Sequence, residues 1–153
     1  MSSCITRRSL LSGFSGILLF APASLAYAHP WPKVTVTKDP SCGCCAGWID
    51  HLRASGFTAE IVETVEINRV KVRLGVPREL ASCHTAEIGG YVLEGHVPAD
   101  AIKRLLAEMP SAKGLAVPGM PVGSPGMEQG AETDPYDVLL IKKDGSTEVF
   151  ASH

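Results

Sequence analysis

Residues 34–55 read VTVTKDPSCGCCAGWIDHLRAS, and this segment has the clearest pattern of secondary structure in the chain. Its first five residues alternate valine with polar side chains, which predicts a short strand over 34–38. Asp39-Pro40 then predicts a turn. The apolar residues that follow have helical spacing over about 44–55, and Gly56 gives the C-terminal stop. Three cysteines therefore lie at a turn between a strand and the start of a helix.

The same alternation of elements continues along the chain. Residues 57–65 predict a second strand. Ile67, Val70 and Leu74 then mark one face of a second helix, which Pro77 ends. The order strand, helix, strand, helix predicts an α/β sheet that contains a parallel pair of strands.

The second half of the chain adds a third helix and a long irregular segment. Residues 85–94 are strand-like, with Gly89-Gly90 as a kink or tight turn. A third helix follows Pro98 and ends near Met109-Pro110. Residues 110–130 hold four prolines and five glycines in 21 positions, which predicts a loop without regular structure.

The C-terminal residues predict a β-hairpin. Two strand-like stretches, 137–142 and 147–150, flank the turn sequence Lys143-Asp144-Gly145-Ser146. We therefore expect an α/β domain with a mixed sheet of about four to five strands, three helices and a C-terminal hairpin.

The N-terminal residues have the features of an export signal. Arg7-Arg8 precede an apolar stretch over 10–20, and Ala26-Tyr27-Ala28 supplies the small residues that a signal peptidase recognises. The apolar run is shorter than the roughly 20 residues that span a bilayer. We expect a signal peptide over 1–28, of the twin-arginine type, and a periplasmic domain over 29–153.

Composition narrows the functions that remain. The chain has 153 residues, which suits one domain, and its formal net charge is −2. Cleavage before His29 removes two arginines and no acid, so the mature domain carries −4 and keeps four of the five cysteines. It lacks the basic patch that nucleic acid binding or membrane attachment needs, so we expect neither partner. The cysteines would meet an oxidising compartment.

The sequence Cys42-Gly43-Cys44-Cys45 combines a C-x-x-C pair with a third cysteine. Free backbone N–H groups and the helix dipole at the start of a helix favour thiolates. A C-x-x-C at such a turn is typical of a thioredoxin-type redox site, whereas three thiolates at one turn form most of a soft-metal site. A third interpretation is two ordinary disulfides, Cys42–Cys45 and Cys44–Cys83.

Cys83 falls directly before the third predicted strand. A thioredoxin-like fold usually carries a cis-proline at this place, packed against its C-x-x-C, and here no proline is available. A cysteine there would bring a fourth sulfur toward the first three. The sequence therefore favours a metal site, on the condition that Cys83 lies close to the other three cysteines in space.

Met120 and Met127 each follow a Pro-Gly pair in the irregular segment. A Pro/Gly loop is an unusual place for a methionine that only fills the core. Thioethers bind soft cations, above all Cu(I), and scarcely bind zinc. His84, next to Cys83, and His96 are further candidate ligands. We identify no candidate catalytic residue, so a metal-binding protein is favoured over an enzyme.

These motifs together resemble the CopG family of exported metal-binding proteins, which is associated with bacterial copper resistance. The resemblance runs in order through almost the whole mature chain: CGCC with Trp48, SCHTA over 82–86, GYVLEGHVP over 90–98, and GLAVPGMP with GSPGME over 114–128. It implies a thioredoxin-like fold and a cysteine-bridged Cu(I) cluster. The implied ligands are Cys42, Cys44, Cys45 and Cys83, with Met120, Met127, His84 and His96 as further candidates.

We therefore expect a periplasmic Cu(I)-binding protein that sequesters or handles copper under copper stress. Its partners would be copper ions and other periplasmic copper-handling proteins. A zinc protein with a Cys4 site is the alternative for the metal. A thiol-disulfide oxidoreductase, with Cys42 as nucleophile and Cys45 as resolving thiol, is the alternative from another class.

Overall fold

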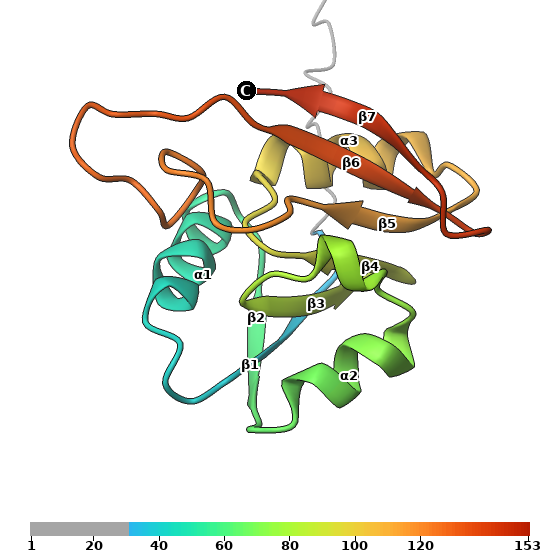
Figure 1. The fold of residues 1–153 in the computed structure, drawn as a ribbon, viewed down its shortest axis with the longest axis horizontal. Coiled ribbons are helices and arrows are strands. Elements are labelled where there is room, and N and C mark those ends of the chain that lie inside the picture. The colour runs from blue at the N-terminus through green and yellow to red at the C-terminus, as the bar shows by residue number, and fades with distance from the viewer. Residues whose placement is uncertain (1–30) are drawn as a thin grey trace, which may run out of the picture.

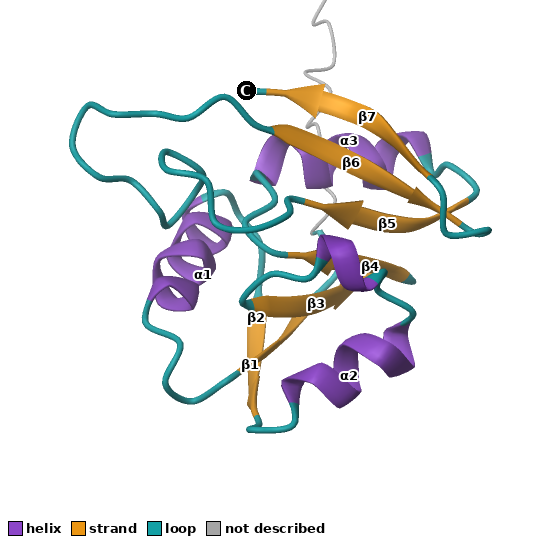
Figure 2. Ribbon diagram, viewed as in Figure 1, coloured by secondary structure: helices purple, strands orange, loops and turns teal. Residues whose placement is uncertain are grey.

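The structure is a computed structural model that describes residues 31–153 (Figure 1). Helices and strands alternate in its first half, and strands dominate its second half (Figure 2). The strands are β1 (Val34–Lys38), β2 (Ala59–Glu63), β3 (His84–Ile88), β4 (Tyr91–Glu94), β5 (Ala112–Ala116), β6 (Asp137–Lys142) and β7 (Thr147–Ser152). The helices are α1 (Cys44–Ala54), α2 (Ile67–Leu74) and α3 (Ala99–Glu108), with a short 3₁₀ helix, η1 (Arg78–Leu80). The predicted signal peptide lies outside the described residues.

The seven strands of the described residues form one mixed sheet in the order β2-β1-β3-β4-β5-β6-β7. β1 pairs in parallel with β2 across α1, and β4 pairs in parallel with β5 across α3. The other neighbouring strands are antiparallel, and β6 and β7 form the C-terminal hairpin. The prediction of an α/β domain with a parallel pair, three helices and a C-terminal hairpin is confirmed.

The two faces of the sheet carry different helices. On one face, Trp48 of α1 and Ile102 of α3 pack with Ile88 of β3 in the main apolar core. On the other face, α2 contacts β1 and β3, and Leu80 of η1 packs with Ile141 of β6. Because side chains alternate along a strand, neighbouring residues of β3 and β4 point to different helices.

The sheet has more strands than the four to five that the sequence predicted. One reason is the segment 85–94, which we expected to be one strand-like stretch. Gly89 and Gly90 have φ values of 55° and 87°, and they join β3 to β4 as a two-residue hairpin turn. Positive φ at both central residues is what a type I′ turn requires. Of the kink and the tight turn expected at Gly89-Gly90, the tight turn is confirmed, and it reverses the chain.

The other reason is β5, which lies inside the segment 110–130 that we predicted to be irregular. That prediction is wrong for residues 112–116. The strand sequence AKGLA has little intrinsic preference for a strand. β5 forms because it lies between β4 and β6 in the sheet, where Leu115 is fully buried. The irregular loop runs only from 117 to 136.

This loop packs against α1 through two glycines. Gly126 has a φ of 85°, and a Cβ at this position would lie 2.4 Å from the backbone nitrogen of Trp48. A Cβ on Gly47 would lie 2.9 Å from the Cα of Gly126. The absence of both side chains lets the two backbones touch. The loop is therefore held beside the first turn of α1.

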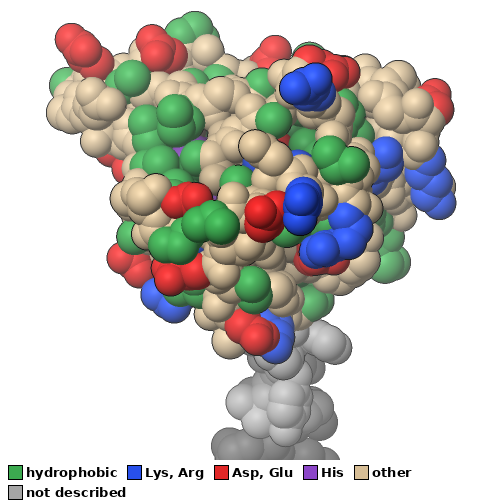
Figure 3. All heavy atoms as spheres, turned by 60° about the horizontal axis from the view of Figure 1, so that its bottom comes forward, with side chains coloured by type: hydrophobic (Ala, Val, Ile, Leu, Met, Phe, Trp, Pro, Cys, Tyr) green, Lys and Arg blue, Asp and Glu red, His purple; other side chains and the backbone are tan. Residues whose placement is uncertain are grey.

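Acidic and basic side chains are interspersed on the face shown in Figure 3. This mixture agrees with the small formal net charge of the chain, −2. Within residues 31–153, no helix has the length and apolar character needed to cross a membrane.

Gly126→Ala tests the contact between the loop and α1. The new Cβ would be strained at positive φ and would collide with the backbone of Trp48. We expect the free energy of unfolding, measured by urea denaturation, to fall by more than about 2 kcal/mol. Gly130→Ala is the matched control, because Gly130 also has positive φ but has open space around it. We expect a loss of about 1 kcal/mol there, and equal losses for the two variants would contradict the prediction.

Candidate metal centre

The turn between β1 and α1 places three cysteines at the start of a helix. The carboxylate of Asp39 accepts hydrogen bonds from the backbone N–H of Ser41 (2.8 Å) and from its hydroxyl (2.5 Å), which closes the turn. α1 begins at Cys44, and no side chain caps its first turn. Cys44 and Cys45 therefore lie at the positive end of the helix dipole.

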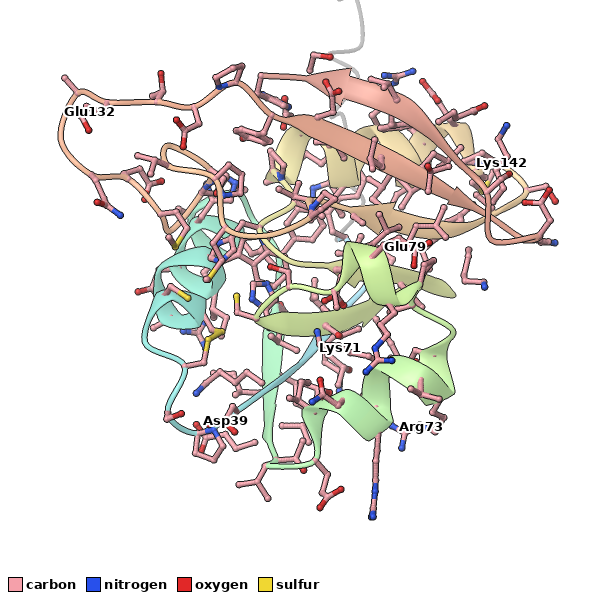
Figure 4. All side chains as sticks on the ribbon, in the orientation of Figure 1. Asp39, Lys71, Arg73, Glu79, Glu132 and Lys142 are labelled. Carbon is pink, nitrogen blue, oxygen red and sulfur yellow. A yellow bond between two sulfur atoms is a disulfide. The ribbon has the colours of Figure 1, made fainter. Side chains whose placement is uncertain are left out.

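Four cysteine sulfurs converge at this turn. Cys42 and Cys45 form a disulfide, drawn in Figure 4 as a yellow bond beside α1, whereas Cys44 and Cys83 are free thiols. Cys44 Sγ lies 3.7 Å from Cys42 Sγ and 3.8 Å from Cys83 Sγ. The four sulfurs lie within 4.8 Å of one another, and we call them the sulfur group. The condition on Cys83 is met, and only the first of the two disulfides considered above has formed.

Strand pairing explains how Cys83 reaches this turn from a distant part of the sequence. β3 pairs antiparallel with β1, so that His84, the first residue of β3, lies opposite Lys38, the last residue of β1. Cys83 is one residue outside β3 and therefore lies level with the turn that begins at Asp39. The sheet register, and not the local sequence, brings the fourth sulfur to the other three.

Two buried histidines also contact Cys83. Its Sγ lies 3.2 Å from Nδ1 of His84 and 3.1 Å from Nε2 of His96. Both histidines are fully buried, and the ring of Trp48 packs on that of His84 with centroids 4.3 Å apart. The donor atoms of Cys83, His84 and His96 lie within 4.8 Å of one another, and we call these residues the histidine group.

Burial sets the protonation states of the histidine group. Desolvation, and secondly the nearby Cys44, raise the pKa of the Cys83 thiol to about 12. Desolvation lowers the pKa of His84 to about 3, and it also lowers the pKa of His96. At neutral pH the metal-free group is therefore a thiol with two neutral imidazoles. A metal ion that binds Cys83 must displace the thiol proton.

A buried ion pair lies on the opposite face of the sheet from the core that holds His84. Lys71 Nζ, from α2, lies 2.5 Å from Oε1 of Glu94, and Figure 4 shows Lys71 pointing from α2 toward β3. The hydroxyl of Thr85 accepts a hydrogen bond from Lys71 (2.8 Å) and donates one to Glu94 (2.6 Å). The backbone N–H of Ser82 also donates to Glu94 (2.5 Å). This network fixes the ends of β3 and β4, and those ends carry the histidine group.

Sequence reasoning missed Lys71 and Glu94. A signal for the lysine was present, because Lys71 lies four residues after Ile67 and three before Leu74, on the apolar face of the predicted helix. A buried lysine needs an acidic partner. Nothing in the sequence identifies Glu94 as that partner, since the contact depends on how α2 packs on the sheet.

The two methionines predicted as ligands lie in the loop after β5, which two contacts tie to the site. The hydroxyl of Ser82 donates to the carbonyl of Gly119, the residue before Met120. Gly126, the residue before Met127, packs against α1. Met120 is 52% exposed, and Met127 is half-buried. Their role as ligands stays a prediction.

Comparisons with known proteins add independent information. A family model described as "Protein of unknown function, DUF411" matches residues 80–127, which include Cys83, both buried histidines and both loop methionines. Two solved structures, named copper resistance protein CopG, Form 2 and Form 1, are each 46% identical to this chain. Each alignment covers 80% of this chain and 98% of the other, with TM-scores of 0.77 and 0.76. No curated protein matches the chain.

The fold and the site together define a mixed α/β domain with a partly buried cluster of cysteines and histidines that could hold a metal ion. The identity to the two solved structures, and the share of the chain that they cover, then identify its family. The chain belongs to the CopG-like DUF411 family, as its sequence motifs predicted.

Lys71→Met should destabilise the domain strongly, because it leaves the Glu94 carboxylate buried without its countercharge. We expect the free energy of unfolding at pH 7, measured by urea denaturation, to fall by about 3–5 kcal/mol. Lys33→Met is the matched control, because Lys33 forms an exposed ion pair with Glu60. There we expect a loss below about 1 kcal/mol. A loss at Lys71 no larger than the control would refute a structural role for the buried pair.

Acid should destabilise the metal-free domain in a pH range set by its buried histidines. The folded-state pKa of His84, about 3, lies below its ordinary value of 6.5. The unfolded chain therefore binds a proton first, and stability is lost as the pH falls below about 6.5, by about 1.4 kcal/mol per pH unit. Urea denaturation between pH 6.5 and about 5 would measure this slope.

His84→Gln should reduce the slope over this range by about 1.4 kcal/mol per pH unit, because glutamine does not titrate, while the buried His96 still contributes. His153→Gln is the control, since His153 is exposed at the C-terminus. An unchanged slope in the His84 variant would show that another group causes the acid sensitivity.

Proposed function

We propose that this protein is a periplasmic Cu(I)-binding protein that holds a cysteine-bridged copper cluster for copper sequestration, handling or resistance. The observation that carries the proposal is the convergence of four sulfurs within 4.8 Å of one another. Membership in the same family as the copper resistance protein CopG supports it. The proposed ligands are Cys42, Cys44, Cys45 and Cys83, joined by Met120, Met127, His84 and His96.

The cluster belongs to the reduced form of the domain. A dithiol reductant that supplies two electrons and two protons converts the Cys42–Cys45 disulfide into two thiols and is itself oxidised to a disulfide, and metal binding then displaces the protons. Thiolates and thioethers are soft ligands that select Cu(I). The net charge of the site also favours Cu(I) over Zn²⁺. Four thiolates around one Zn²⁺ would leave a net charge of −2 in a partly buried site, whereas several bridged Cu⁺ ions bring that charge toward zero.

A thioredoxin-like fold is part of the same proposal. It is supported by the strand order β2-β1-β3-β4, with β1 and β2 parallel and β3 antiparallel to β1. The C-x-x-C lies between β1 and α1, and Cys83 lies before β3, where such a fold would have its proline. In this interpretation β5, β6 and β7 extend the sheet beyond its thioredoxin-like part.

Export is the remaining part of the proposal. It comprises a twin-arginine signal peptide over 1–28, cleavage before His29 and a periplasmic domain over 29–153. The Cys42–Cys45 disulfide supports it, because disulfides persist mainly in oxidising compartments. Other periplasmic copper-handling proteins would then donate or accept the copper.

The decisive test is copper stoichiometry of the purified protein, reduced and loaded with Cu(I) under anaerobic conditions. We expect more than one copper per chain, and Cys83→Ser should lose most of it because the variant removes the sulfur that completes the sulfur group. Unchanged loading in this variant would exclude Cys83 from the site. If equal amounts of Cu(I) and Zn²⁺ gave a chain with one tightly bound zinc and no copper, the copper proposal would be wrong.

A separate set of variants tests whether Met120 and Met127 are copper ligands. Met120→Leu and Met127→Leu should each weaken Cu(I) binding if their thioethers are ligands. Met109→Leu is the matched control, because Met109 is 73% exposed at the end of α3, outside the loop. Equal Cu(I) affinity in all three variants would remove the methionines from the site.

A thiol-disulfide oxidoreductase is the second candidate, and the Cys42–Cys45 disulfide favours it. Cys42 is partly exposed and Cys45 is fully buried, as suits an attacking and a resolving thiol. Neither Cys83 nor the loop methionines have a part in such a reaction. Insulin reduction that survives Cys83→Ser and Met120→Ala would support this function, and its absence in the unaltered protein would exclude it.

A further inference from the structure

The sulfur group and the histidine group share one atom, Cys83 Sγ, but they depend differently on the disulfide. In the structure Cys42 and Cys45 are joined, so two of the four sulfurs are not available as thiolates. The histidine group loses nothing, because none of its donors belongs to the disulfide. Compared with the reduced form, the disulfide form therefore offers a metal fewer sulfur donors and the same two histidine nitrogens.

His96 is held in the state that a metal ligand needs. Its Nδ1 lies 2.7 Å from the carbonyl oxygen of Pro125, which can only accept a hydrogen bond. The proton of the neutral ring is therefore on Nδ1, and the lone pair of Nε2 faces Cys83 Sγ at 3.1 Å. A histidine that ligates a metal commonly donates its other N–H to such a carbonyl.

His84 carries an unexplained polar atom. Its Nε2 is buried and has no hydrogen-bond partner among the described residues, while its Nδ1 lies 3.2 Å from Cys83 Sγ. An unpaired nitrogen of a buried imidazole costs free energy. Coordination of a metal through Nδ1 would offset that cost and would give a reason for a histidine at this fully buried position.

The distances suit a single tetrahedral ion. A sulfur and a nitrogen bound to one tetrahedral zinc lie about 3.5 Å apart, and two bound sulfurs lie about 3.8 Å apart. The two nitrogens are a few tenths of an ångström closer to Cys83 Sγ than this, so a small outward shift would admit the ion. Cys44 is also a free thiol, and its Sγ lies 3.8 Å from that of Cys83.

Charge and ligand type indicate which ion fits. One sulfur and two imidazoles form a borderline set that suits Zn²⁺ better than the soft Cu(I) ion. A single Cys83 thiolate leaves a charge of +1 with a divalent ion, which is a smaller excess than the −2 of four thiolates around one Zn²⁺. A water molecule would complete the tetrahedral shell, as in zinc sites with three protein ligands.

We propose that the disulfide form of this domain has a second, mononuclear metal site, made by Cys83, His84 and His96, that binds a borderline divalent ion of the Zn²⁺ class. The redox state of Cys42 and Cys45 then selects between two classes of metal at adjoining sites. The second site needs neither of these cysteines, so it does not depend on the copper proposal.

The test uses purified protein in which the Cys42–Cys45 disulfide has been verified by mass spectrometry. Titration with Co²⁺, a spectroscopic substitute for zinc, should give one bound ion with a thiolate-to-cobalt charge-transfer band, and Zn²⁺ should abolish the band by displacement. Cys83→Ser and His96→Gln should each weaken binding by about 100-fold or more. His153→Gln is the control and should bind as the unaltered protein does.

Two further measurements complete the test, and the first needs no variant to fold. In the unaltered disulfide form, Zn²⁺ should shift the ring-nitrogen NMR signals of His84 and His96 and leave those of His153 unchanged. The double variant Cys42→Ser/Cys45→Ser should bind Co²⁺ with the same band but lose the capacity for multiple Cu(I) ions. Absence of the band in the disulfide form, or metal binding only after reduction, would overturn the second site while leaving the Cu(I) result untouched.

Discussion

The buried ion pair between Lys71 and Glu94 is the interaction on which the site depends most. A buried pair of opposite charges is stable only when further hydrogen bonds satisfy both groups. Here Thr85 and the amide of Ser82 make those hydrogen bonds. The pair joins α2 to the ends of β3 and β4 from one face of the sheet. The side chain of His84 projects from the other face, so a polar network on one face of the sheet helps to position donor atoms on the other.

Glycine residues likewise help to position the loop after β5, because they allow close backbone contacts. A Cβ on Gly95, which has a φ of 72°, would lie 2.5 Å from the carbonyl oxygen of Val117, and Gly47 and Gly126 permit the equally close approach of the loop to α1. The glycine and proline content of this region suggested an unstructured connection. These glycines instead allow backbone segments to pack without intervening side chains. High glycine content here is therefore a packing property of the site.

Most of the helices and strands could be predicted from local patterns, because α1, α2 and α3 each have a clear apolar face and a stop signal. β5 could not, since it depends on its partners in the sheet, and at Gly89-Gly90 local patterns left a kink and a tight turn as alternatives. The three clustered cysteines were found from their spacing alone. Cys83 required a hypothesis about topology, and the contact of both histidines with the same sulfur follows from strand register, which single-sequence patterns do not encode.

The burial of the four cysteines is graded across the sulfur group. Cys42, Cys44 and Cys83 are partly exposed, whereas Cys45 and the two histidines are fully enclosed. Under the proposed function, an incoming ion would meet the three partly exposed sulfurs first and would reach Cys45 only by exchanging ligands. The exposed sulfurs are therefore the ones a donor protein could contact while it still held the ion.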